Sequence, residues 1–167
     1  MKIRDLKKIL FLTFLVVFVG SCGVTFRELT PSNYVGFSME GYMELTTEVV
    51  LDGTLDGFSL TDSVFLHKRL AKGTNVVEIY VIHFEKVSDA TSFWYSWGRE
   101  NFSTLRTALS AIPLVYGELK GEVFNEYIYA WFNGKWVYIF RGTENSVKET
   151  ARKFKSFMKE LKRSIES

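Results

Sequence analysis

Residues 126–141 form the segment of this sequence that most constrains its fold. The segment reads Glu-Tyr-Ile-Tyr-Ala-Trp-Phe, then Asn133-Gly134, then Lys-Trp-Val-Tyr-Ile-Phe-Arg. Both halves are rich in aromatic and β-branched residues, which is typical of strands. Asn-Gly favours a two-residue type I′ turn, because that turn needs positive φ at both central positions. The segment therefore predicts a β-hairpin whose register is set by its turn.

This turn predicts which residues face each other across the hairpin. Trp131 lies opposite Trp136, and Glu126 lies opposite Arg141, a favourable cross-strand pair of charges. The remaining predicted pairs are Tyr129 with Tyr138, Tyr127 with Phe140, Ala130 with Val137, and Ile128 with Ile139. One face then carries six aromatic residues: Tyr127, Tyr129, Trp131, Trp136, Tyr138 and Phe140.

Both faces of this hairpin are apolar, whereas a sheet with one solvated face shows one polar set. Either helices cover both faces, or one face lines a cavity or a contact surface. We expect the aliphatic face to pack on a helix. The aromatic face is the candidate ligand- or partner-binding surface, with Tyr127, Tyr129, Trp131, Trp136 and Tyr138 as its residues. The alternative is that the rings are ordinary core, covered by a helix that begins near Ser88.

An earlier segment predicts a second hairpin, formed by residues 63–71 and 76–85. If Ala71 faces Val76, then Arg69 faces Glu78. His67 and His83 fall on opposite faces in this register, so we expect no metal site made by these two histidines. The face expected to be buried carries Val64, Leu66, Leu70, Val77, Ile79 and Val81.

Apolar spacing predicts four helices. The first covers residues 39–50, with a stripe of Met39, Tyr42, Met43, Thr46, Val49 and Val50. The second begins at Ser88 or Asp89, which can act as N-cap, and ends near Gly98. Its apolar stripe is Ala90, Phe93, Trp94 and Trp97. A short third helix covers residues 103–112, and Pro113 ends it.

The last helix begins with Ser146-Val-Lys-Glu149, a capping-box sequence. A narrow apolar stripe follows: Val147, Ala151, Phe154, Met158, Leu161 and Ile165. Basic residues occupy the other sides of this helix. A coiled-coil seam is one interpretation, and a helix docked on the sheet is the favoured one.

These elements predict an α+β fold, in which an antiparallel sheet of at least four strands packs against helices that include a long C-terminal one. We expect one globular domain over residues 37–167, with the helices and sheet in two layers. The sequence contains no nucleophile elbow, HExxH motif or phosphate loop. We therefore expect no enzyme activity, no catalytic residues, no cofactor and no metal.

The N-terminus is typical of an export signal. Lys2, Arg4, Lys7 and Lys8 precede an apolar run over residues 9–19, which is too short to span a bilayer, since spanning takes about 20 residues. Residues 22–167 hold 17 basic and 18 acidic residues. The basic balance of the chain therefore belongs to the signal, and nothing in the rest indicates nucleic-acid binding.

The end of this segment, Val19-Gly20-Ser21-Cys22, resembles the lipobox of bacterial lipoprotein precursors. The resemblance covers residues 1–22. It implies that Cys22 carries diacylglycerol, that residues 1–21 are removed as a signal peptide, and that acyl chains such as palmitate hold the protein on a membrane. The alternatives are an uncleaved anchor or an ordinary secretory signal. Residues 22–36 are expected to form a short lipidated tether.

The rest of the chain is weakly similar to small secreted bacterial domains of unknown function. The similarity rests on Val-Val-Glu-Ile-Tyr before Val-Ser-Asp-Ala, and on Trp-Phe-Asn-Gly-Lys-Trp-Val-Tyr-Ile. It implies no functional residues. Together with the lipobox, it favours a non-catalytic lipoprotein of the cell envelope, on the outside of the cytoplasmic membrane or in the outer membrane facing the periplasm. The expected partners are membrane lipid through Cys22, and an envelope protein or a small apolar ligand. A structural scaffold with a packed core is the alternative, and a hydrolytic enzyme is a remoter one.

Overall fold

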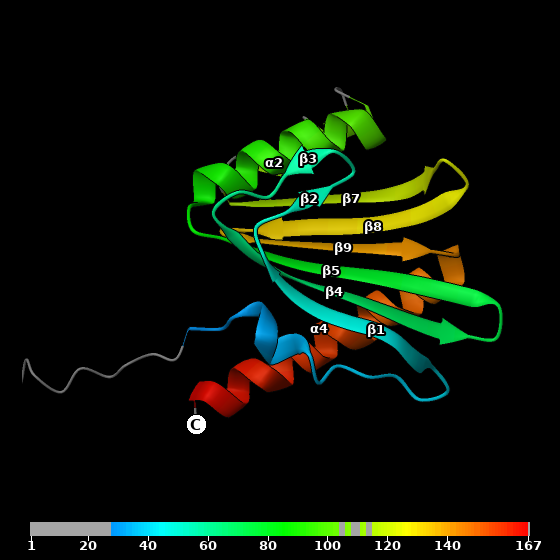
Figure 1. Ribbon diagram of the computed structural model, residues 1–167. Coiled ribbons are helices and arrows are strands. Elements are labelled where there is room, and N and C mark those ends of the chain that lie inside the picture. Colours follow the sequence, from blue (N-terminus) through cyan, green and yellow to red (C-terminus); the bar gives the residue numbers. More distant parts are fainter. Residues whose placement is uncertain (1–27, 104–105, 108–110, 113–114, 167) are drawn as a thin grey trace, which may run out of the picture.

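The computed structural model describes residues 28–103, 106–107, 111–112 and 115–166. The main sheet has seven antiparallel strands in the order β1-β4-β5-β9-β8-β7-β6, and the helices α2 (Val87–Asn101) and α4 (Glu144–Glu166) lie on opposite sides of it (Figure 1). The strands of the main sheet are β1 (Met43–Leu51), β4 (Ser63–Lys72), β5 (Asn75–Phe84), β6 (Ala111–Ile112), β7 (Tyr116–Val123), β8 (Glu126–Asn133) and β9 (Trp136–Gly142). The predicted α+β class is confirmed, but the arrangement has three layers rather than two.

The two faces of the sheet form two separate cores, because apolar residues alternate along the central strands. The aliphatic face of the hairpin β8–β9 packs against Phe93, Trp94 and Trp97 of α2. The aromatic face packs against Val147, Ala151 and Phe154 of α4. The prediction that a helix packs on the aliphatic face is therefore confirmed. The alternative in which the helix near Ser88 covers the rings is wrong, since α4 covers them.

The N-terminal part of the described chain belongs to the core of the α4 face. The short helix η1 (Pro31–Tyr34) brings Tyr34 to within 5.4 Å of the Phe154 ring, and Tyr34 is buried. The Lys68 side chain is also buried there, with its Nζ atom 2.7 Å from the carbonyl of Val35 and 2.6 Å from a Glu44 carboxylate oxygen. The domain thus begins before residue 37. Residues 1–27, with the predicted signal and Cys22, lie outside the described part.

The hairpin β4–β5 has the predicted register. Ala71 pairs with Val76, and Arg69 pairs with Glu78, with 3.1 Å between the Arg69 Nε atom and the carboxylate. His67 stacks on Tyr80, with ring centroids 4.5 Å apart. His83 contacts Trp136 on the opposite face of the sheet. The prediction that the two histidines point to opposite sides is confirmed.

The hairpin β8–β9 has a register two residues away from the predicted one. Asn133 pairs with Trp136, and Trp131 pairs with Tyr138. Gly134 and Lys135 are therefore the central turn residues. Gly134 has φ 58°, and Lys135 is not among the residues with positive φ. A type II′ turn needs positive φ only at its first central position, so one glycine satisfies it.

This shift keeps some predictions and overturns others. Side chains alternate with a period of two, so a two-residue shift leaves all six rings on one face, as predicted. The predicted pair of Glu126 with Arg141 is wrong. Arg141 lies opposite Ile128 on one side and Glu78 on the other, while Glu126 lies opposite Val123. Arg141 forms its salt bridge with Asp56 instead, so the opposite charges of Glu126 and Arg141 gave no true check of the register.

The helix predicted over residues 39–50 is wrong, because this segment contains the edge strand β1. Its β-branched residues suit a strand. The pairing with β4 is irregular between Glu44 and Thr46, so one extra residue interrupts the alternation and imitates helical spacing. Met43 and Leu51 are 64% and 76% exposed, because β1 has a neighbour on one side only.

Smaller differences concern helix ends. The N-cap of α2 is Lys86, so Ser88 and Asp89 lie inside the first turn rather than before it. The helix α4 begins at Glu144, so the predicted capping box at Ser146 is likewise inside the first turn. In the segment 103–112, residues 106–107 are helical, but 111–112 form β6, and the remaining positions after 103 lie outside the described part. The docked position of the last helix is confirmed.

A small hairpin, β2 (Thr54–Leu55) with β3 (Phe58–Ser59), is tied to the α2 face by its turn. Asp56 accepts hydrogen bonds from both terminal nitrogens of Arg141 and, at 2.8 Å, from the Trp97 indole. Burial opposes ionisation of Asp56, but these donors outweigh it and hold its pKa below the ordinary value. The charged form of Asp56 therefore stabilises the folded chain.

We expect Asp56→Asn to lower the free energy of unfolding by about 1–2 kcal/mol near pH 7, since charge-assisted bonds are lost. A depressed folded-state pKa contributes stability above the unfolded value of about 3.9, and this contribution disappears as pH falls through the folded pKa. The difference between wild type and variant should therefore shrink below about pH 4. Urea unfolding at several pH values measures it. A difference that stays constant with pH would show that Asp56 is not held as a carboxylate.

Candidate functional site

The middle of the aromatic face is closed core. Trp131, Tyr138 and Phe140 are 5%, 3% and 0% exposed. Trp131 stacks on Phe140 with ring centroids 5.2 Å apart, and Phe154 of α4 meets Phe140 at 5.3 Å. Burial raises the pKa of Tyr138 well above its ordinary value. These rings stabilise the fold, and α4 covers almost all of their surface.

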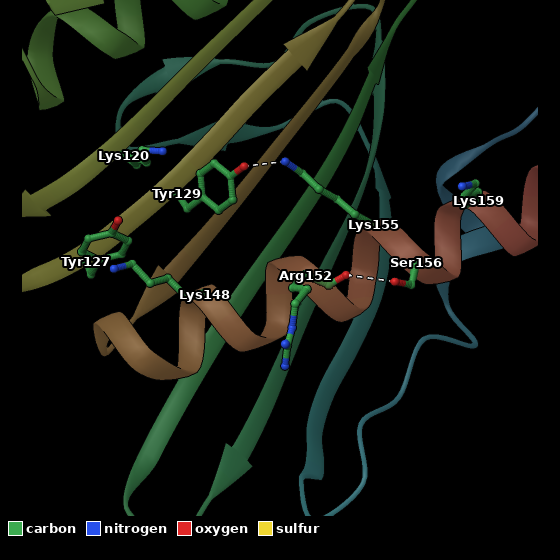
Figure 2. A pocket seen from close by; sticks show the side chains of 8 residues that line it. All are labelled: Lys120, Tyr127, Tyr129, Lys148, Arg152, Lys155, Ser156 and Lys159. Carbon is green, nitrogen blue, oxygen red and sulfur yellow. Dashed lines mark hydrogen bonds between the residues drawn. The ribbon is translucent and has the colours of Figure 1, made fainter.

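The margin of the same face is open where β8 runs beside α4. Tyr127 and Tyr129 are half-buried there. They form part of a groove of about 500 Å³ (Figure 2). The groove is lined by Lys120, Tyr127, Tyr129, Lys148, Arg152, Lys155, Ser156 and Lys159. Its volume is within the range of small-molecule sites.

Strand and helix periodicity bring the tyrosines and lysines together. Tyr127 and Tyr129 are two residues apart on β8, so both rings project from one face. Lys148 and Lys155 are seven residues apart on α4, which is close to two full turns, so both leave the same side of the helix. Their side chains reach toward the tyrosines, whereas Arg152 points away from them (Figure 2).

Each of these lysines lies over an aromatic ring. The Lys148 Nζ atom is 5.5 Å from the centre of the Tyr127 ring. The Lys155 Nζ atom is 4.7 Å from the Tyr129 ring centre and 4.4 Å from that of Trp131, and it donates a hydrogen bond to the Tyr129 hydroxyl. Cations over ring faces are attracted by the ring quadrupole. The lysines therefore cover the rings of the groove.

The groove is strongly positive. Its lining has five basic side chains and no carboxylate. Two of the five form salt bridges, with Glu144 2.6 Å from Lys148 and Glu118 3.5 Å from Lys120, and the charge of Glu118 also acts on Lys155. Among the described residues, Arg152 and Lys159 form no salt bridge. The positive charge is therefore compensated only in part, and an anion would be attracted to the groove.

Burial also shifts the pKa values of two groups in the groove, Tyr129 and Lys155. Burial, with the nearby charge of Glu118, raises the pKa of Tyr129 to about 12. Burial lowers the pKa of Lys155, because desolvation disfavours the ammonium. Tyr129 is thus a neutral hydroxyl at physiological pH. It can donate a hydrogen bond to a ligand as well as accept the one from Lys155.

A smaller hollow of about 170 Å³ continues along the aromatic face. Its lining includes Trp131, Asn133, Trp136 and Tyr138 from the sheet, and Lys162 from α4. The five residues predicted as a binding surface are therefore all on one face, but they divide between two hollows. Tyr127 and Tyr129 line the larger one, and Trp131, Trp136 and Tyr138 border the smaller one.

The basic side of the groove was not predicted from the sequence, where the basic residues of the last helix were assigned only to the sides outside its apolar stripe. The signal that could have found them is their spacing. Lys148, Lys155 and Lys162 repeat every seven residues. They therefore share one side of the helix, next to the apolar stripe rather than opposite to it.

Other kinds of site have less support in the described part of the chain. It contains no group of three or more His, Cys, Asp or Glu residues that could hold a metal ion. None of its helices has the length and apolar character needed to cross a bilayer. The chain also matches no family model, no curated protein and no solved structure.

Proposed function

We propose that this chain is a membrane-anchored protein of the cell envelope that binds an anionic ligand without catalysis. The groove between β8 and α4 is the proposed ligand site. The observation that carries the proposal is the combination of two half-buried tyrosines with five basic side chains around one hollow of about 500 Å³. Aromatic rings offer apolar contact area, and the cations favour a negatively charged ligand over a purely apolar one.

The proposed anchor is the acylated Cys22. Glu28, the first described residue, lies six positions after Cys22 in the sequence. A chain of that length reaches at most about 20 Å, so the anchor would hold the domain near the membrane. Two or three acyl chains are enough for stable attachment, since each buried methylene contributes about 0.8 kcal/mol.

The anchor is tested by intact mass. We expect the membrane-extracted protein to begin at Cys22 and to carry acyl mass, and we expect Cys22→Ser to abolish both the acylation and the cleavage before this residue. Ser21→Ala is the matched control, because another small residue should still be processed. A mature chain that begins elsewhere, or that carries no acyl group, would refute the anchor.

The ligand site is tested by reversing one charge. We expect the domain to bind inorganic tripolyphosphate with an affinity that falls as salt rises, because salt screens charges. Lys155→Glu should weaken this binding at least tenfold, since an attractive contact becomes a repulsive one. Lys153→Glu is the control, because Lys153 is exposed on α4 but does not line the groove. Isothermal titration calorimetry measures both.

The outcome separates binding from a second candidate, an assembly scaffold. The closed core around Trp131 favours the scaffold, because a packed interior needs no ligand. Equal losses in Lys155→Glu and Lys153→Glu, or no binding of tripolyphosphate by the wild type, would exclude the groove as an anion site. The scaffold would then be the better account of the fold.

A further inference from the structure

We infer that the ligand of the groove is a linear acidic polysaccharide that lies along α4, with sugar rings on Tyr127 and Tyr129 and carboxylates next to the lysines. This inference rests on the proposed function, because it names the ligand class of the same site. Three features of the groove lead to it: a repeat of contacts along its length, a second hollow in line with the first, and recessed rings.

The repeat comes from a match between strand and helix spacing. Seven residues of α4 advance by about 10 Å, and so do three residues of β8. Lys148 accordingly lies over Tyr127, while Lys155 lies between Tyr129 and Trp131. Lys162 borders the smaller hollow beside Asn133. A lysine therefore returns at a constant interval beside the β8 side chains, as a polymer with regularly spaced charges requires.

The two hollows extend this arrangement in one direction. The larger hollow is bordered by residues 148–159 of α4 and by Tyr127 and Tyr129. The smaller one is bordered by Met158 and Lys162 of α4, and by Trp131 and Asn133. The hollows thus follow each other along both β8 and α4, and they meet on α4 near Met158 and Lys159. A long, narrow ligand can occupy both, whereas a compact anion fills only one.

The rings favour sugars over a membrane surface. Tyr127 and Tyr129 are half-buried between the strand and the helix, so a flat bilayer would touch the rim and not the rings. The apolar face of a sugar ring can lie on each tyrosine, and the Tyr129 hydroxyl can bond a sugar hydroxyl. Each lysine then leaves the ring face for the carboxylate of the same sugar, which its flexible four-carbon stem allows.

The test uses oligogalacturonates of defined length as probes for the full domain. A hexamer should bind at least tenfold more tightly than a trimer, because only the hexamer reaches both hollows. Lys162→Glu should reduce hexamer affinity about tenfold and leave trimer affinity unchanged. Lys153→Glu should change neither. Neutral cello-oligosaccharides of the same lengths should bind at least a hundredfold more weakly than the acidic ones.

Other probes distinguish two outcomes: that the ligand is not an acidic polysaccharide, and that the groove is not an anion site at all. Equal affinity for trimer and hexamer, or an equal effect of Lys162→Glu on both, would overturn the polysaccharide. So would tighter binding of phosphatidylglycerol vesicles or of single-stranded oligothymidylate than of the hexamer. If tripolyphosphate binds while oligogalacturonates do not, the anion site stands and the ligand class is wrong. If no probe binds, both proposals fail.

Discussion

Trp131→Ala is expected to lower the free energy of unfolding by about 3–5 kcal/mol, the usual cost of truncating a buried large aromatic residue. The Trp131 side chain is 5% exposed, and its ring stacks on Tyr138 at 5.0 Å and on Phe140 at 5.2 Å. Tyr138 and Phe140 are not free to fill the space, because both are themselves packed against Phe154. Urea unfolding of the domain without residues 1–22 gives the value.

Phe124→Ala is the control for Trp131→Ala. The Phe124 side chain is 87% exposed in the turn between β7 and β8, so its loss should change stability by no more than about 0.5 kcal/mol. A cost below about 1 kcal/mol for Trp131→Ala would mean that α4 does not close over this ring. The whole aromatic face would then be available for binding, and the division between core and groove would be wrong.

Gly142→Ala is expected to cost about 3 kcal/mol, because two effects add at this position. Gly142 has φ 147°, in a region that residues with a side chain avoid. A Cβ atom here would lie 2.4 Å from the carbonyl oxygen of Val76, a backbone atom that cannot move without disturbing β5. Thermal and urea unfolding should both show the loss.

The position of Gly142 connects this prediction to the groove. It ends β9, and α4 begins two residues later at Glu144, so the backbone at Gly142 sets the direction in which α4 crosses the aromatic face. Gly36→Ala is the control, since nothing lies within 4 Å of its added Cβ atom and its φ is not positive. If Gly142→Ala cost as little stability as Gly36→Ala, then the backbone of β9 would not approach β5 as closely at Gly142 as it does in the structure.

The fold class was predictable because its main signals are local. Alternation in β4, β5, β8 and β9 identified two hairpins, and the apolar stripe of α4 identified a docked helix. The register of β8–β9 could not be predicted, because Asn133-Gly134 is compatible with two turns. Asn133 and Gly134 can be the two central residues of a type I′ turn, or Gly134 alone can be the first central residue of a type II′ turn. Sequence alone does not decide between them when both registers place the same residues on the same face.

The remaining errors have tertiary causes. Strand β1 is at an edge and carries an irregular position between Glu44 and Thr46, so its apolar residues lack a strict period of two. Nothing in the sequence states that α4 rather than α2 covers the aromatic face, because both helices have apolar stripes. Nothing in the sequence indicates that Lys68 is buried, since its burial depends on the chain around Val35, which folds over it.

The candidate site was predictable only in part. The tyrosines and tryptophans of β8 and β9 pointed to the face that carries the groove, since aromatic side chains with polar groups are unusual in a wholly dry core. The open margin and its positive charge depend on where α4 lies across the sheet. That position follows from the packing of Phe154 on Phe140 and Tyr34, which are contacts between segments far apart in sequence.

The central claim is that the groove beside α4 is the ligand site, and NMR chemical-shift mapping tests it most directly. Tripolyphosphate would be titrated into the isotope-labelled domain, with backbone amides and indole N–H groups observed. We predict that the perturbed signals are those of Tyr127, Tyr129, Lys155 and their neighbours on β8 and α4, with Trp97 on the α2 face unchanged. Perturbation centred on Trp97 and α2, or no perturbation at millimolar ligand, would contradict the account.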